Sequence, residues 1–477
     1  MTVDIGTTRV KLGFFDEAGT QLALAKHPTP TQPDQWGVVY DVPALRGLVT
    51  AFISGLGEDL RARIERIAIA GVGESGGLVA PDLSLASPMI LWFDQRGAPL
   101  LAALSDEERD EIYRITGLPA SPNYGLSKLA WAAQHTTSVG ENLLWLNISE
   151  YLAATMTGMR WAEYTLASRT MALDLASSGW SPRIAELAGI DAALLPPLRR
   201  AAEGQPVAAD FAERVCLPST VAVHVVGHDH MVGGVGAGLR PGEILNSTGT
   251  TEGILMLRDQ PSTDEQMAAA QLANGIACDG ERFTLFASIP TGGAAFAALQ
   301  SMLGTSTAAL VECVESLADE YRAGAIDLAA IPVVVPQFRG SPPPRKSARA
   351  RGAIANLGTD VRPADIVFGT FLGMALQFRT VAQLFGPAAG PVKVIGPASE
   401  NPLWLHLKAD VLQAELSVST FPEVVSRGAQ ALASAVATDW TGVRPFTVSP
   451  DSVRHAQLLD WHEESRTVLR DLSTVVW

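Results

Sequence analysis

Two turns rich in glycine and hydroxyl residues constrain this sequence more than any other feature. Asp4-Ile5-Gly6-Thr7-Thr8 stands at the start of the chain, with Lys11 just after it, and Ser247-Thr248-Gly249-Thr250-Thr251 stands past its middle. Each follows an apolar run that reads as a strand. Glycine lets backbone N–H groups approach a phosphate closely, and the hydroxyls add further donors. One such turn usually closes an ordinary hairpin, but two of them predict the two phosphate clips of one ATP site.

The predicted site also needs a metal ligand and positive charge. Asp4 is expected to hold Mg²⁺, through water because Mg²⁺ dehydrates reluctantly. The chain as a whole carries a net charge of −15. An acidic surface repels nucleic acid and anionic membranes, so neither is an expected partner. The electropositive surroundings of ATP must therefore be local, and Lys11, backbone N–H groups and helix N-termini are their expected source.

Length and composition predict a globular protein of two or three domains. The chain has 477 residues, of which 47% are hydrophobic and 18% charged. A single core does not grow to that size. The three cysteines, Cys216, Cys278 and Cys313, form no C-x-x-C pair and fit buried apolar positions in a reducing compartment. No basic-then-apolar leader and no apolar run of membrane-spanning length is visible, so we expect a cytoplasmic protein.

The order of the predicted elements is that of an α/β protein whose pattern restarts once. Strands are expected at residues 10–15, 38–40 and 64–70, and helices at 44–56, 100–116, 127–135, 149–157 and 182–187. After Pro218 a strand at 221–226 leads to Gly227-His228-Asp229-His230 and a small-residue helix at 231–238. Strands at 243–246 and 253–257 flank the second clip. A helix at 294–299, a loop at 339–351, a strand at 392–395 and a helix at 402–412 complete the prediction.

With these segments in place, the chain resembles the FGGY carbohydrate kinases, a family that includes glycerol, xylulose, ribulose, fuculose and gluconate kinases. The resemblance runs nearly end to end and rests on motifs in the family's order. These are the two clips, Trp92-Phe93-Asp94-Gln95-Arg96, Lys128-Leu129-Ala130-Trp131, Ala167-Ser168-Arg169-Thr170-Met171, Gly227-His228-Asp229 with Gly233-Gly234 and Gly236-Ala237-Gly238, Ala350-Arg351-Gly352-Ala353, and Gly396-Pro397-Ala398-Ser399-Glu400-Asn401-Pro402 with Trp404.

The resemblance implies a fold and a set of roles. The fold would be two ribonuclease-H-like domains of the actin, hexokinase and Hsp70 ATPase type, with a nucleotide cleft between them. We expect an N-terminal domain at 1–218, a C-terminal domain at 219–445 and a helical segment at 446–477. The residues expected to bind ATP are Asp4, Gly6, Thr7, Thr8, Lys11, Thr248, Gly249, Thr250, Gly292, Gly293, Gly396, Ala398, Ser399 and Asn401.

Two departures from the family pattern affect the substrate and the adenosine site. The adenosine motif usually opens with several glycines, but Pro397 and Ala398 follow Gly396 here. The stretch Gly71-Val72-Gly73-Glu74-Ser75-Gly76-Gly77 lies where xylulose kinases carry Gln-Met-His-Gly and glycerol kinases carry Arg-Glu. It matches neither, and Gly76 stands in place of the xylulose-kinase histidine. We therefore do not expect the substrate to be read in the standard way of either enzyme.

Asp229 is the predicted general base. A carboxylate that follows a strand and precedes a glycine-rich helix can face a cleft and accept the proton of the attacking hydroxyl. Local sequence alone favours an N-cap, because Asp before a helix satisfies free N–H groups. The resemblance reverses that preference, and it also makes Asp229 a ligand of the metal and a contact of the substrate.

Glu74, Asp94, Arg96, Asn123 and His228 are the other predicted substrate-binding residues. Charged groups beside an aromatic ring can hold sugar hydroxyls in fixed hydrogen bonds. The alternative for Asp94 and Arg96 is a surface ion pair at a strand end. For Glu74 it is a solvated carboxylate, and for Asn123, which follows Pro122, it is an ordinary loop.

Three further features have more than one possible interpretation. His228, Asp229 and His230 suggest a metal site, but zinc needs three or four converging ligands, so packing or hydrogen bonding near the sugar is the preferred reading. The basic loop at 339–351 is expected to be solvated at the mouth of the cleft or to face phosphate. Gly292-Gly293 fits close approach to the nucleotide and tight helix packing equally well.

These observations predict an ATP- and Mg²⁺-dependent kinase for a small sugar, with a ketopentose first and a polyol such as glycerol or a tetritol second. A rival from another class is an ATP-switched binding protein on the same fold, which the fold alone does not exclude. Asp229 and the segment from Trp92 to Arg96 favour the kinase, because a nucleotide switch needs no sugar cleft. A homodimer is left open.

Overall fold

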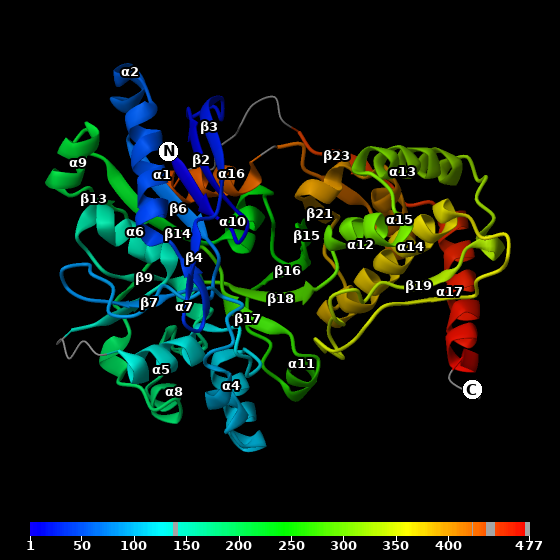
Figure 1. Cartoon of the computed structure of the whole chain (residues 1–477), viewed down its shortest axis with the longest axis horizontal. Coiled ribbons are helices and arrows are strands. Elements are labelled where there is room, and N and C mark those ends of the chain that lie inside the picture. The colour runs from blue at the N-terminus through cyan, green and yellow to red at the C-terminus, as the bar shows by residue number, and fades with distance from the viewer. Residues whose placement is uncertain (137–141, 422, 436–443, 473–477) are drawn as a thin grey trace.

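The computed structural model describes residues 1–136, 142–421, 423–435 and 444–472. The described chain forms two lobes that lie side by side, the first mostly blue to cyan and the second green to red (Figure 1). Each lobe is built on one large mixed sheet, of six strands in the first and seven in the second. The predicted α/β class and the repeated use of one architecture are thus confirmed.

The first sheet has the strand order β13-β14-β6-β1-β2-β3. Its strands are β1 (Thr2–Ile5), β2 (Arg9–Phe15), β3 (Gln21–Pro28), β6 (Arg66–Gly71), β13 (Gln205–Pro206) and β14 (Ala222–His228). β1, β6 and β14 run parallel, and all are fully or almost fully buried, as their continuous apolar sequences predict. The helices α1 (Val42–Gly55), α6 (Ile148–Thr157) and α9 (Ala209–Val215) bury apolar faces in the same core.

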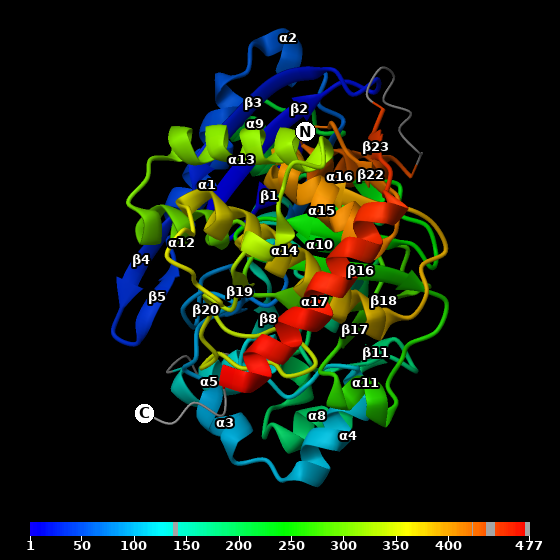
Figure 2. The same ribbon diagram turned by 90° about the vertical axis from the view of Figure 1, so that its right-hand side faces the viewer.

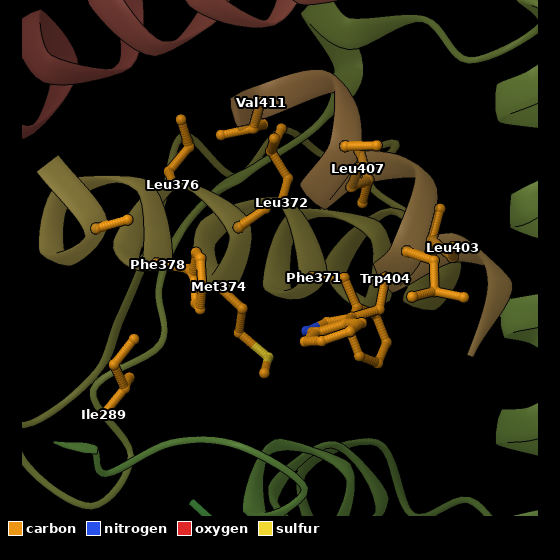
Figure 3. Packing of buried hydrophobic residues seen from close by; sticks show 14 of the residues in the cluster. Ile289, Phe371, Leu372, Met374, Leu376, Phe378, Leu403, Trp404, Leu407 and Val411 are labelled. Carbon is orange, nitrogen blue, oxygen red and sulfur yellow. The ribbon is translucent and has the colours of Figure 1, made fainter. Parts of the chain in front are cut away.

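The second sheet has the order β17-β18-β16-β15-β21-β22-β23. Its strands are β15 (Ile244–Thr248), β16 (Glu252–Arg258), β17 (Ala273–Ile276), β18 (Phe283–Ile289), β21 (Val392–Ile395), β22 (Leu416–Val418) and β23 (Phe446–Val448). The long helix α14 (Pro363–Ala382) packs on α15 (Pro402–Leu412), and Figure 3 shows Phe371, Phe378, Trp404 and Leu407 from these two helices gathered in one apolar cluster.

Helix α16 (Val424–Ser434) crosses back from the second half of the chain to the first sheet. It packs on β1, β6 and β14 and on helix α10 (Asp229–Gly236), which follows β14. A Cβ on Gly236 would lie 2.0 Å from the carbonyl oxygen of Val424, and one on Gly428 would lie 1.9 Å from that of Val232. The two helices therefore cross in direct backbone contact, which only glycine at these positions permits.

The domain boundary differs from the one predicted. Strand β14 begins after residue 218 but pairs with β6 in the first sheet, so the first domain extends at least to His228. At the other end, residues 446–448 form β23, an edge strand of the second sheet, before the predicted C-terminal helix α17 (Ser452–Leu472). Figure 2 shows α17, in red, lying across the outer face of the second lobe.

Most predicted elements lie within a few residues of the observed ones, with one clear error. The helix expected at 100–116 is two helices, α3 (Ala98–Ala102) and α4 (Asp106–Thr116). Ser105 caps α4 through Glu108 in a capping box, which starts a new helix at that point. Within the described residues no single helix is long and apolar enough to cross a membrane, although the bent pair α12 (Ala294–Leu303) and α13 (Thr307–Arg322) passes that test together.

Candidate active site

Three parallel strands of the first sheet end side by side. Ile5 of β1 pairs with Gly71 of β6, and Gly71 pairs with His228 of β14. The segments that leave these strands contain the first clip, the loop with Glu74, and Asp229. Ligands of open α/β sheets bind at the carboxyl ends of such strands, so the topology brings the predicted phosphate, sugar and base residues to one edge.

Asp4 and Lys11 form the charged centre of the first clip. Lys11 Nζ lies 3.4 Å from Asp4 Oδ2 and 3.3 Å from Glu423 Oε2, so one lysine bridges β1 and the start of α16. Burial raises the pKa of Asp4 to about 6, against the opposing effect of Lys11 and with a further contribution from Asp229. The charge of Asp229 therefore acts on Asp4, and carboxylate oxygens such as these are the ligands that a hard divalent cation prefers.

The glycine and threonines of the first clip are held from both sides. Gly6 N donates to the carbonyl oxygen of Arg9 (3.0 Å), and the Thr29 hydroxyl donates to the carbonyl oxygen of Gly6 (2.7 Å). Trp92 Nε1 donates to the Thr7 hydroxyl (2.9 Å). This last bond ties the clip to the predicted sugar segment, a link that sequence alone does not reveal. The side chains of Thr7 and Thr8 remain exposed.

The second clip is supported by the glycine pair that follows β18. Gly293 N donates to the carbonyl oxygen of Gly249 (2.8 Å), and Gly292 N donates to that of Thr250 (3.2 Å). A Cβ on Gly292 would lie 2.6 Å from the carbonyl carbon of Thr251. The two glycines thus pack against the clip itself. By contrast, a Cβ on Gly249 would meet no protein atom closer than 3.9 Å, so the protein leaves open space at that position.

The predicted adenosine segment adjoins the second clip. The Thr248 hydroxyl donates to the carbonyl oxygen of Ile395 (2.9 Å) and accepts from Ala398 N (3.1 Å). Gly396 has φ of +96°, and a Cβ there would lie 2.0 Å from the carbonyl oxygen of Thr248. Ser399 and Asn401 have structural partners, because Ser399 Oγ donates to the carbonyl oxygen of Gly396 and Asn401 Oδ1 caps α15 by accepting from Trp404 N.

A buried cation lies beneath the second clip and was missed at the sequence level. Lys408 of α15 is fully buried and donates to Asn246 Oδ1 (2.7 Å) and Glu252 Oε2 (2.9 Å), the residues on either side of the clip. Its ammonium also lies 3.6 Å from the Trp404 ring centroid. Burial lowers the pKa of Lys408 to about 8. A lysine in an apolar helix face is the signal that could have revealed this anchor.

Asp229 is the first residue of α10 and not its N-cap. The cap position is His228, and it provides no side-chain cap bond, so the N-cap alternative is wrong in detail. Asp229 Oδ1 instead accepts from His230 N (2.7 Å) and lies 3.3 Å from His228 Nε2. Burial raises the pKa of Asp229, although His230 opposes the shift, and a raised carboxyl pKa suits a general base working near neutral pH.

Glu74 is paired with Arg169, a residue named in the sequence motifs but given no role there. Arg169 donates from Nε (2.9 Å) and Nη2 (2.8 Å) to Glu74 Oε1. The guanidinium carbon lies 5.1 Å from the Tyr124 ring centroid and 5.5 Å from that of Phe286, which belongs to the second sheet. Arg169 is 3% exposed, and its Nη1 has no hydrogen-bond partner among the described residues. The pair therefore lies at the junction of the two lobes.

Asp94 and Arg96 bind each other. Arg96 Nη2 lies 2.7 Å from Asp94 Oδ2 and Nη1 lies 2.9 Å from Asp34 Oδ2, with the Arg96 side chain 3% exposed. The guanidinium also lies over the rings of Trp36 and Trp131. Asp94 and Arg96 therefore form the predicted ion pair, but the pair is buried and not at the surface. A sugar contact by either residue stays a prediction.

Asn123 and the basic loop also have defined surroundings. Asn123 Oδ1 accepts from Gln95 Nε2 (3.1 Å), and its carbonyl oxygen accepts from the buried Lys128 Nζ (2.6 Å). Burial lowers the pKa of Lys128 to about 7, and the lysine clamps this loop against α5 (Gly125–His135). The five basic residues between 339 and 351 are exposed and form no helix or strand. Lys346 nevertheless lies close enough to Arg169 and Glu74 for their charges to act on it, and burial lowers its pKa, so the loop reaches the predicted site.

Comparison with known proteins independently supports the predicted family and fold. The model of the FGGY family of carbohydrate kinases, N-terminal domain, matches residues 1–236, and that of the C-terminal domain matches 244–437. Among curated relatives, glycerol kinase 1 of Lactiplantibacillus plantarum is 26% identical over 94% of this chain and 90% of its own. A glycerol kinase of Lactobacillus acidophilus is also 26% identical, over 93% and 90%.

Solved structures match over almost the whole chain. A ligand-bound xylulose kinase from Lactobacillus acidophilus has a TM-score of 0.87 at 17% identity, covering 99% of both chains. A gluconate kinase from the same organism has a TM-score of 0.87 at 18% identity, covering 99% and 97%. Plasmodium falciparum glycerol kinase with ADP has a TM-score of 0.84 at 19% identity, covering 98% of both. The fold is thus the two-domain, actin- and hexokinase-like ATPase fold that the sequence predicted.

Proposed function

The chain belongs to the FGGY family of carbohydrate kinases, which are ATP-dependent phosphotransferases, and from that premise we propose that it phosphorylates a hydroxyl of a short polyol. The observation that carries this proposal is the ion pair of buried Arg169 and partly buried Glu74, which lies close enough to Asp229 for the charge of Glu74 to act on it. A ketopentose, ranked first from the sequence, becomes the second candidate.

The pair favours a polyol substrate. Glycerol kinases carry an adjacent Arg-Glu pair in the stretch that contains Glu74, and here Arg169 and Glu74 bring the same two side chains together from distant positions in the chain. Here Gly73 precedes Glu74, and a Cβ on Gly73 would lie 2.9 Å from Arg169 Cγ. The side chain of Arg169 therefore fills the space that a side chain at residue 73 would enter. A guanidinium and a carboxylate held together offer both donors and acceptors to neighbouring hydroxyls. The curated relatives named above are glycerol kinases, which agrees with this choice.

In the proposed reaction, the chain's own residues position two substrates and move one proton. The N–H groups and hydroxyls of the two clips hold the phosphates, with Lys11 adding charge. Asp4 and Asp229 are the residues that would hold Mg²⁺, which neutralises phosphate charge when it is bound. Asp229 accepts the proton of the attacking hydroxyl. Closure of the lobes over Phe286 and Arg169 excludes water, so the phosphoryl group passes to the alcohol.

The test is a screen of ADP release by the purified protein with Mg²⁺-ATP. The acceptors are glycerol, tetritols, pentitols, ketopentoses and gluconate, each compared by kcat/KM. We expect a polyol to give the highest value, and Arg169→Lys to lower it by raising KM for the acceptor, because Lys cannot make the same paired bonds. A ketopentose at least tenfold better than every polyol would reverse the choice of substrate. No acceptor-stimulated ADP release from any compound would remove the polyol proposal.

A further inference from the structure

His228, Asp229 and His230 bring three metal-ligating groups together. One ring nitrogen of each histidine and one carboxylate oxygen all lie within 4.8 Å of one another, and these three residues form the one such cluster in the described ranges. The strand ends at His228 and the helix begins at Asp229, so the backbone turns between them and three consecutive side chains meet. From the sequence we preferred packing or hydrogen bonding near the sugar to a metal here, because zinc sites usually need three or four converging ligands.

The surroundings of the two histidines fit ligation. His230 Nδ1 lies 2.7 Å from the Ser247 hydroxyl, and a hydrogen bond at one ring nitrogen is what orients a metal-ligating histidine. His228 is 5% exposed, yet its Nδ1 has no hydrogen-bond partner among the described residues. The other ring nitrogen, Nε2, is the one that faces Asp229, at 3.3 Å from Oδ1, so Nε2 is the nitrogen placed to share an ion with that carboxylate. The side chain of Asp229 is 23% exposed, which leaves an open side for an ion to enter.

We propose that His228, Asp229 and His230 form a site for a single transition-metal ion of the Zn²⁺ type, and that the ion inhibits the enzyme. Two imidazoles and a carboxylate select Zn²⁺ or Co²⁺ over Mg²⁺, which prefers oxygen ligands alone. Tetrahedral zinc with bonds of about 2.0–2.1 Å separates its ligand atoms by roughly 3.4 Å. His228 Nε2 and Asp229 Oδ1 are already 3.3 Å apart, and all three ligand atoms lie within 4.8 Å of one another, so side-chain rotation has to bring the set closer together around the ion.

Inhibition follows from the identity of the middle ligand. A carboxylate oxygen that donates its electron pair to zinc is a weak proton acceptor, so the bound ion removes the base that phosphoryl transfer uses. The fourth position faces the open side of Asp229, where it takes water or an acceptor hydroxyl. The inhibition rests on the proposed function, whereas the binding of zinc does not.

The first experiment measures binding. The full-length protein, freed of metal, is titrated with Zn²⁺ by calorimetry and with Co²⁺ by visible absorption, which reports nitrogen and oxygen ligation. We expect one site per chain, with affinity lowered at least tenfold in His230→Gln and in His228→Gln. The matched control is Cys216→Ser, since Cys216 is exposed and free; it should bind as the wild type does. No binding, or binding lost in Cys216→Ser and kept in both histidine variants, would overturn the site.

A second measurement uses the wild type alone and so does not depend on the folding of any variant. Diethyl pyrocarbonate modifies accessible imidazoles, and peptide mass spectrometry locates the product. Zinc should protect His230 and leave the modification of His27, on β3, unchanged. Equal modification of His230 with and without zinc would count against the site. If zinc binds there but turnover with excess Mg²⁺-ATP is unaffected, the inhibitory role is wrong while the site stands.

Discussion

The hydroxyl of Thr248 donates a 2.9 Å hydrogen bond to the carbonyl oxygen of Ile395. The two residues end the neighbouring parallel strands β15 and β21. The bond therefore fixes the predicted second clip relative to the predicted adenosine segment, and the same hydroxyl accepts from Ala398 N. One side chain thus sets the spacing between the two parts of the proposed nucleotide site.

Thr248→Val should weaken nucleotide binding about tenfold. Valine keeps the shape but leaves the carbonyl oxygen of Ile395 and the N–H of Ala398 without this partner, at a cost of about 1–3 kcal/mol. Calorimetric titration with ADP measures the effect. The control is Thr370→Val, where the lost hydroxyl bonds only within its own helix, to Ile366. Equal ADP affinity in both variants would contradict the role given to Thr248.

Gly249→Val should abolish ATP binding while the protein stays folded. The protein leaves open space beside Gly249, with its nearest atom at 3.9 Å from a Cβ, so any collision must be with the ligand. Thermal unfolding should change little, and acceptor binding should persist. The control is Gly47→Ala in α1, where a Cβ also meets nothing within 4 Å. Unchanged ATP affinity in folded Gly249→Val would mean that the second clip does not touch phosphate.

Asp229→Asn should lower turnover by about 10²–10⁴-fold, the usual contribution of general-base help. The amide keeps the hydrogen bond from His230 N but cannot accept the proton. ADP affinity should stay within a few-fold of the wild-type value. Near-wild-type kcat on the best acceptor would remove Asp229 from the mechanism.

Asp94→Ala distinguishes two possible roles of the Asp94 carboxylate, a structural ion pair with Arg96 and a direct contact with the sugar. Both oxygens of Asp94 already accept hydrogen bonds from Arg96, and removing them leaves a buried guanidinium with only Asp34 opposite. We expect a lower free energy of unfolding, by about 1–3 kcal/mol, and a modest change in acceptor KM. A ten- to hundred-fold rise in acceptor KM with unchanged stability would instead show direct contact with the sugar.

Glu150→Gln should flatten the pH dependence of stability. Burial raises the pKa of Glu150 from 4.5 to about 8, so the folded state holds a proton that the unfolded state has released. Stability is then fully present below pH 4.5 and is lost as pH rises towards 8, by about 1.4 kcal/mol per unit. Urea unfolding from pH 5 to 8 measures the slope. The exposed Glu58→Gln serves as control, and an unchanged slope in Glu150→Gln would refute the assignment.

The fold class and the order of elements could be predicted from the sequence alone, whereas the role of the two clips stays a prediction. These features depend on local chemistry: apolar runs that bury as strands, glycines where the backbone must approach another group, and residues that cap helices. The strands at 221–226 and 392–395 and the helix at 402–412 were predictable for that reason. The helix at 100–116 was mispredicted because its apolar pattern continues across Ser105, where a capping box starts a new helix.

Which charged groups meet depends on the three-dimensional fold and could not be predicted from the sequence. Arg169 and Glu74 are 95 residues apart, and Lys408 and Glu252 are 156 apart. The local sequence around each of these residues does not identify the residue it pairs with, because sheet register and helix packing determine which charged groups meet in a core. The same holds for His228, Asp229 and His230: their order is plain in the sequence, but their convergence depends on where the strand ends and the helix begins. Side-chain chemistry is local, whereas proximity is a property of the whole fold.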